Sequence, residues 1–166
     1  MSSIEPWLRG TNTDVPAVGR AVLHALQLAD EDLRKWCGSL SDAEVNASPA
    51  GLAPVAFHIR HIARSLDRLL TYAEGRSLTE EQIARLRTEL DPGANLADLF
   101  AEVTAALSNA AARVRALAQT NLEEARTVGR SQLPTTVGGL LVHIADHTQR
   151  HVGQAITTAK LLRNSA

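Results

Sequence analysis

The chain has 166 residues, of which 45% are hydrophobic but only 3% aromatic, and its net charge is −1 at neutral pH. This length fits one domain over residues 1–166, and the small net charge argues against nucleic acid as a partner, because nucleic-acid binding needs clustered basic residues. The single cysteine, Cys37, excludes an intramolecular disulfide. No apolar run approaches the roughly 20 residues of a membrane span and no export signal is evident, so we expect a cytoplasmic protein.

The composition favours helices, because Ala and Leu are strong helix formers and only six prolines and ten glycines interrupt the chain. Four long segments repeat apolar residues at steps of three and four. They span about 14–36, about 54–74, about 95–119, and from Thr135 or Thr136 to about Arg163. Asp14 and Asn95 are suitable N-caps for the first and third segments, and Gly75 is the expected end of the second.

Two shorter segments begin with a capping box, in which a hydroxyl residue and an acid or amide three positions later satisfy each other's backbone. Ser41 and Glu44 predict a short helical turn. Thr79 and Gln82 predict a helix that reaches Leu90. Residues 121–134 are expected to be irregular.

Four amphipathic helices bury their apolar stripes best against one another, so the predicted fold is all-α, a four-helix bundle with short accessory helices in the connections. The connections before the third and the fourth helix are long for a simple up-and-down bundle. We therefore expect at least one crossover or accessory helix in them.

The histidines carry the clearest chemical signal, because five of the six fall in two short helical windows. His147 and His151 lie four positions apart, so they project from one helix face with Cβ atoms about 5–6 Å apart. Two imidazoles at that spacing can bind one metal ion. His143 lies one turn earlier, and His58 and His61 form a second cluster upstream.

A helical wheel indicates which of these histidines can meet inside the protein. His147 and His151 flank the apolar stripe of the last helix, with Gln154 on the same side, whereas His143 lies further away. On the second helix, His58 lies nearer the apolar stripe than His61. Periodicity alone therefore narrowly favours His58 as the third ligand.

Other polar residues carry weaker signals. Lone His24 is interpreted as an ordinary structural histidine, and Cys37 beside Trp36 as a packed or half-exposed thiol rather than a nucleophile. A row of arginines at positions 60, 64 and 68 is typical of a solvated helix face.

Two other metal chemistries fit the sequence less well. No Glu-x-x-His pair is present, which argues against a ferritin-like di-iron carboxylate centre. The stretch from His143 to His147 has the spacing of the His-x-x-Glu-His peptidases, but Asp146 replaces the glutamate and has a shorter reach. A peptidase is therefore disfavoured.

Two motifs together resemble the DinB-like (YfiT-like) superfamily: Phe57-His-Ile-Arg-His-Ile-Ala-Arg-Ser65 and His147-Thr-Gln-Arg-His-Val-Gly-Gln154. The resemblance implies a four-helix bundle in which one histidine of the second helix and two of the fourth bind a divalent metal. By position it assigns His61, His147 and His151 as the ligands. His58 then becomes a supporting group or an alternate ligand, so the resemblance and the wheel disagree.

The resemblance also implies a function, because members of the superfamily include thiol-dependent S-transferases and isomerases. A metal-dependent hydrolase or S-transferase would act on a small molecule, with zinc, nickel or iron as the metal and a low-molecular-weight thiol as a cofactor. Arg60, Arg64 and Arg150 are candidates to receive an acidic substrate. The alternative is a non-catalytic bundle with a structural or vestigial metal site that works through homodimerisation or a protein partner.

Overall fold

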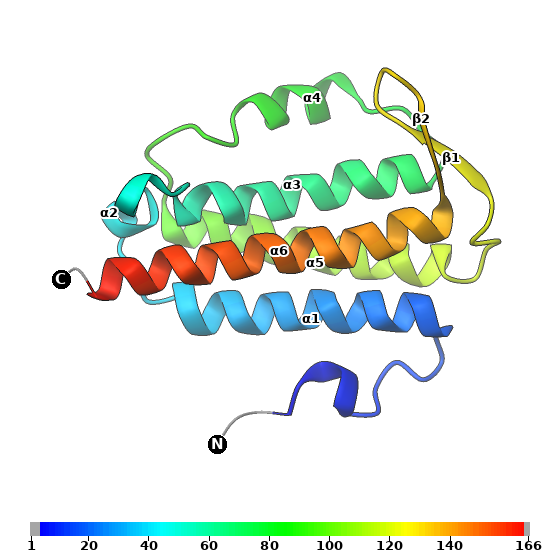
Figure 1. The fold of residues 1–166 in the computed structure, drawn as a ribbon, viewed down its shortest axis with the longest axis horizontal. Coiled ribbons are helices and arrows are strands. Elements are labelled where there is room, and N and C mark those ends of the chain that lie inside the picture. Colours follow the sequence, from blue (N-terminus) through cyan, green and yellow to red (C-terminus); the bar gives the residue numbers. More distant parts are fainter. Residues whose placement is uncertain (1–3, 165–166) are drawn as a thin grey trace.

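The structure, a computed structural model, describes residues 4–164. Four long helices pack side by side around an aliphatic core (Figure 1). They are α1 (Ala17–Cys37), α3 (Val55–Ala73), α5 (Leu96–Leu117) and α6 (Val137–Asn164). The prediction of a mainly helical protein is confirmed, and among the described residues no helix has the length and apolarity to span a membrane.

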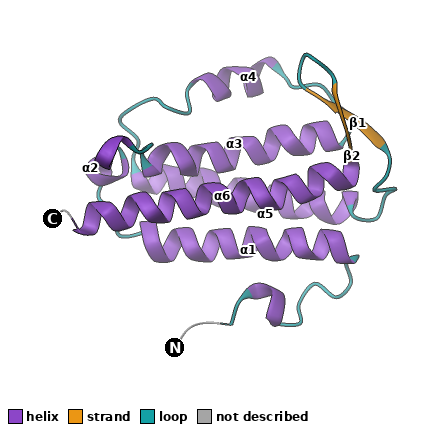
Figure 2. Ribbon diagram, in the orientation of Figure 1, coloured by secondary structure: helices purple, strands orange, loops and turns teal. Residues whose placement is uncertain are grey.

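Short elements precede the first long helix and fill the connections between the long helices (Figure 2). They are η1 (Pro6–Leu8), α2 (Asp42–Val45), η2 (Pro49–Gly51), α4 (Glu80–Arg87), and an antiparallel hairpin of β1 (Ala125–Val128) with β2 (Leu133–Thr136). The hairpin corrects the expectation of an irregular segment over 121–134. Four-residue strands give little periodic signal, and Pro134 argued against a strand even though an edge position tolerates it.

Local signals set most helix boundaries as expected. The hydroxyls of Ser41 and Thr79 each accept a hydrogen bond from the backbone three residues on, and both capping boxes are complete. Asn95 caps α5 by accepting from the Asp98 backbone. Gly75 ends α3 with φ +74°, a conformation that costs glycine little.

Two boundaries differ from the sequence prediction. Pro16, not Asp14, occupies the N-cap of α1, because the proline ring already holds φ near its helical value and the helix begins directly after it. Helix α4 ends at Arg87, three residues before Leu90. The residues after Arg87 turn toward α3 instead of continuing the helix, and this turn has consequences for the site.

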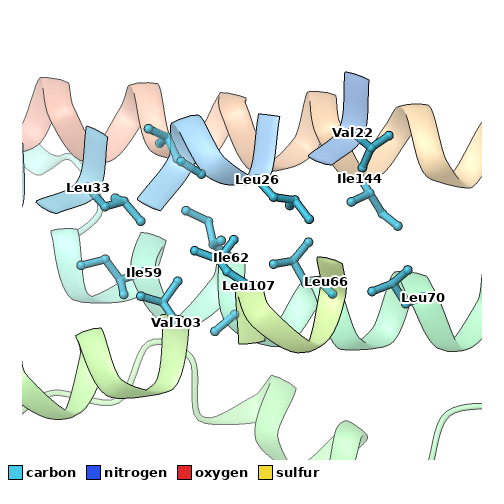
Figure 3. Packing of buried hydrophobic residues seen from close by; sticks show 14 of the residues in the cluster. Val22, Leu26, Leu33, Ile59, Ile62, Leu66, Leu70, Val103, Leu107 and Ile144 are labelled. Carbon is cyan, nitrogen blue, oxygen red and sulfur yellow. The ribbon is translucent and has the colours of Figure 1, made fainter. Parts of the chain in front are cut away.

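The core consists of side chains from all four long helices, as Figure 3 shows for Leu26, Ile62, Leu66, Val103 and Ile144. Ile62 and Leu66 are fully buried, and burial of one such side chain stabilises the fold by about 1.5–3 kcal/mol. The low aromatic content predicted this aliphatic core.

The connection between α3 and α5 is a crossover. Arg113 near the end of α5 binds Asp67 and Glu74 near the end of α3, so these two helices run in the same direction. The chain must therefore travel back along α3 between them, and α4 lies on this return path at the outer side of α3 (Figure 1). The expected crossover and accessory helix are thus one segment, which passes directly over the α3 histidines.

Candidate metal centre

The α3 and α6 helices pack against each other and bring the two histidine windows together. His61 from α3 and the pair His147 and His151 from α6 each offer one ring nitrogen, and these three atoms lie within 4.8 Å of one another. All three residues are half-buried, at the edge of the apolar core. Of the two arguments from sequence, the family resemblance selected the histidine that joins this cluster.

The nitrogen spacing matches that of ligands to one ion. His61 Nε2 and His147 Nε2 lie 3.1 Å apart, and the His151 ring centroid lies 4.3 Å from that of His61 and 4.7 Å from that of His147. Two imidazole nitrogens that each bind zinc at 2.0–2.1 Å in a tetrahedral site are about 3.4 Å apart. A single ion can therefore be reached with small side-chain shifts.

Glu89 fixes the orientation of His61. Its Oε2 lies 2.7 Å from His61 Nδ1, and its Oε1 accepts a 2.7 Å bond from Arg68. The carboxylate is buried, with 4% of the residue exposed. Burial raises the pKa of Glu89, but the hydrogen bonds from His61 and Arg68 outweigh it and hold the pKa below its usual value. A carboxylate at Nδ1 makes that atom the donor and leaves the Nε2 lone pair pointing at His147.

The His147 imidazole is oriented in the same way, with Nδ1 as the donor, by a weaker contact with Ser65. The Ser65 hydroxyl donates to the Ile62 carbonyl, so its oxygen is free to accept from His147 Nδ1, which lies 3.5 Å away. With both Nδ1 atoms as donors, the two Nε2 lone pairs face each other across 3.1 Å. Two lone pairs at that separation repel unless a cation lies between them, so the donor set fits a bound metal.

His58 lies behind the cluster and contacts it through one atom. Its Nδ1 is 3.1 Å from His151 Nδ1, and the residue is 4% exposed. If His151 donates from Nδ1 to His58, the Nε2 atom of His151 is left to bind a metal. The helical wheel correctly placed His58 as the more buried of the two α3 histidines. However, the histidine that is more buried is not the one whose ring approaches both α6 histidines, which is His61.

Electrostatics keep the imidazoles in the form that binds metals. Burial, followed by the charges of the neighbouring histidines, lowers the pKa of His58 and His147 to about 4. Burial, followed by His61 and Arg150, does the same for His151. At neutral pH these rings are uncharged, as a metal ligand must be.

Two further histidines stay outside the cluster. His143 is exposed one turn before His147, and its Nδ1 lies 4.0 Å from Asp146. His24 on α1 bonds to Thr11, which agrees with the structural role expected for it. Cys37 is fully buried, and this burial raises the pKa of its thiol to about 11, so it is no nucleophile.

The arginine row of α3 is not the solvated face that its sequence indicated. Arg68 is 9% exposed and binds Glu89, and Arg64 binds Glu102 of α5 at 2.9 Å. Arg60 donates to the Asp91 carbonyl. The α4 crossover covers this side of α3, and sequence periodicity carries no information about such a cover. Of the arginines considered for an acidic substrate, Arg60 and Arg64 bind groups of the crossover and α5, whereas Arg150 pairs with the exposed Asp146 on its own helix.

Comparison with known families agrees with this geometry. A model of the DinB superfamily matches residues 25–155 of the chain. The chain belongs to the DinB superfamily. The match spans both histidine windows and the crossover that carries Glu89, and it confirms the family resemblance predicted from the sequence. No curated protein matches the chain.

Proposed function

We propose that this DinB protein binds one divalent metal ion through His61, His147 and His151. The observation that carries the proposal is the pair of Nε2 atoms at 3.1 Å, each on a ring whose Nδ1 faces an oxygen acceptor. A proton between the two rings would satisfy the same pair. However, the low pKa of His147 disfavours protonation of the pair at neutral pH.

We further propose that the site is catalytic and acts on a small molecule. Three imidazole ligands leave coordination positions open, and a divalent ion held in this way would supply Lewis-acid chemistry toward a water, a thiol or a substrate oxygen. The protein's own contribution is orientation: Glu89 holds His61, and the His58 ring lies against His151. Glu89 uses one oxygen for His61 and the other for Arg68, so it is a positioning residue and not a free general base.

The remaining parts of the proposal concern the setting of the site. We propose that the four long helices form a four-helix bundle of the DinB type and that residues 1–166 act as one domain in the cytoplasm. The reaction is hydrolysis or S-transfer with a low-molecular-weight thiol, and zinc, nickel and iron all accept imidazole ligands. Nucleic acid is not a partner in this proposal, because acidic and basic residues are balanced.

Metal content measured by plasma mass spectrometry tests the first part of the proposal. We expect about one divalent ion per chain in the wild type, and loss of the ion in His61→Ala and His147→Ala. His143→Ala is the matched control, since it removes an exposed histidine from the same helix. A wild type that takes up no metal after reloading, or a His61→Ala variant that keeps it, would show the proposal to be wrong.

The choice between hydrolysis and thiol chemistry needs a spectroscopic measurement. Cobalt can replace the native ion, and a thiolate bound to cobalt gives a charge-transfer absorption in the near ultraviolet. Addition of cysteine to the cobalt-loaded protein should produce this band if the open positions accept a thiol. A spectrum unchanged by thiol, together with hydrolysis of a small ester, would favour the hydrolase.

A further inference from the structure

A pocket of about 470 Å³ lies beside the histidine cluster, between α6 and the segment that leads into α3. Its volume falls within the usual range for small-molecule sites, about 300–1,000 Å³. The pocket is lined mainly by apolar atoms, with Leu52 and Ala53 on one side and Arg150, Gly153 and Gln154 of α6 on the other. His58 also lines it, and this same residue contacts His151.

The wall of the pocket opposite α6 is held in place. Ala50 and Gly51 both have positive φ, +51° and +76°, and this double left-handed turn directs the following Leu52 and Ala53 toward α6. The Thr158 hydroxyl donates to the Ala53 carbonyl at 3.3 Å and ties the wall to the helix. Leu52 remains 39% exposed, so it offers apolar surface at the pocket instead of filling the core.

Gly153 keeps the α6 side of the pocket open. A glycine inside a helix is destabilising relative to alanine, so a glycine here calls for a reason. Packing does not supply one, because a Cβ at Gly153 would meet nothing within 4 Å. Gly19 of α1 is different, since a Cβ there would overlap with Ala118, the residue directly after α5. The missing side chain at Gly153 thus leaves space where the pocket lies.

The polar groups at the pocket indicate what occupies it. Arg150 is the charged residue among those that line the pocket, since the other ionisable residue there, His58, is neutral at pH 7. Arg150 pairs with Asp146, but the Asp146 side chain is 54% exposed, so this ion pair contributes little to stability. Gln154 lies one turn further on α6, and its side-chain amide forms no hydrogen bond with any residue between 4 and 164. A guanidinium and an amide at positions i and i+4 present several N–H donors on one face, which suits a carboxylate.

We propose that this pocket binds a small carboxylic acid with an apolar body. The carboxylate is held by Arg150 and Gln154, and the hydrocarbon part lies against Leu52, Ala53 and the open surface at Gly153. The ligand is then separated from His151 by a single imidazole, that of His58. As the substrate class of the metal site, this ligand rests on the proposed function, whereas its binding to the pocket does not.

A ligand-observed NMR titration with hexanoate tests the proposal, with hexan-1-ol as the uncharged probe of the same length. The first titration uses metal-free protein, so that the carboxylate has no ion to bind. We expect hexanoate to bind at least about tenfold more tightly than hexanol, because hydrogen bonds to a charged group are stronger than those to a neutral hydroxyl. Arg150→Gln should remove this preference.

Gly153→Leu is the second variant; it adds a side chain at a residue that lines the pocket, and its Cβ would meet nothing within 4 Å. It should abolish binding of both probes while circular dichroism and the melting temperature show an intact fold. Arg163→Gln is the control, since Arg163 is a basic residue of α6 that bonds to Ser39 away from the pocket. Hexanoate that fails to bind, or that binds Gly153→Leu as it binds the wild type, would overturn the proposal.

Repeating the titration with zinc-loaded protein separates this proposal from the metal site. Hexanoate binding to a protein that takes up no zinc would support the pocket and contradict the proposed function. Zinc uptake by a protein that does not bind hexanoate would contradict the pocket and leave the metal site intact.

Discussion

Arg64 and Arg68 lie one turn apart on α3, and each pairs with a carboxylate that another part of the chain brings to it. Glu102 of α5 takes the first arginine and also Arg85 of α4, so it is bound by arginines alone. Glu89 of the crossover divides its oxygens between Arg68 and His61. The two pairs look alike in sequence and in local geometry, yet only the second is connected to the histidine cluster.

Burial is the other difference between the pairs. The side chains of Arg68 and Glu89 are 10% and 5% exposed, whereas Glu102 is 23% exposed. Water can partly solvate Glu102 if its arginine is lost, but it cannot reach Glu89 in the same way. A buried charge pair is weak evidence for stability but costs much when one partner is removed. The comparison therefore separates a pair that fastens helices from one that also orients a site.

The largest expected effect is on stability. Glu89→Ala leaves the Arg68 guanidinium buried without its partner, and we expect a loss of about 3–5 kcal/mol in the free energy of unfolding. Glu102→Ala should cost about 1 kcal/mol or less, because Arg64 keeps its bonds to the Arg85 carbonyl and the Thr88 hydroxyl, and Arg85 is exposed. Urea denaturation of the metal-free proteins measures both values. Equal losses for the two variants would remove burial as the distinction between the pairs.

The next effect is on metal affinity. Glu89→Gln keeps the shape of the side chain but allows an amide N–H to face His61 Nδ1, which favours the tautomer with a proton on Nε2. We expect zinc affinity to fall by about 10- to 100-fold, as is typical when the partner of a ligating histidine is changed. Competition with a chromogenic chelator measures this change. Glu102→Gln is the matched control and should bind zinc as tightly as the wild type does.

Metal addition itself should distinguish the same two variants. Binding to the folded state alone raises the free energy of unfolding by about 2.7 kcal/mol at a free-ion concentration 100 times the dissociation constant. At a fixed zinc concentration, the melting temperature of Glu102→Gln should rise as much as that of the wild type. The rise should be smaller in Glu89→Gln. A rise that is the same in all three proteins would mean that Glu89 has no influence on the bound ion.

The smallest expected effect is on how the free energy of unfolding changes at acidic pH. Burial raises the pKa of Glu102, but the bonds from Arg64 and Arg85 outweigh it and lower the pKa in the folded protein. Its contribution is therefore complete above the unfolded value of about 4.5 and is lost as the pH falls through the folded pKa. Between pH 6 and pH 3, the free energy of unfolding should fall less steeply with decreasing pH in Glu102→Gln than in the wild type. The difference in slope should correspond to less than one proton. A slope equal to that of the wild type would contradict this assignment.

Sequence alone predicted the parts of the protein that depend on neighbouring residues. The capping boxes at Ser41 and Thr79 and the stop at Gly75 were correct, since a cap acts within three or four residues. The sequence also predicted that His147 and His151 lie on one helix face, because residues four positions apart are about one helical turn apart. The hairpin at 125–136 was missed, since four-residue strands have almost no period to detect.

Helical periodicity could not choose correctly between the α3 histidines or find Glu89; the family resemblance pointed to His61, and the tertiary structure shows why it joins the cluster. His58 and His61 lie within one turn of each other on α3, and only the packing of α3 on α6 brings His61 to the rings of His147 and His151. Glu89 lies 28 positions from His61 in a turn without a motif, and only the crossover brings the two residues together. Local patterns in the sequence determined the long helices and two of the three candidate ligands, because those depend on contacts within a turn, whereas the family resemblance pointed to His61 as the third. The third ligand, its carboxylate and the pocket depend on how distant helices meet, and that information is not local.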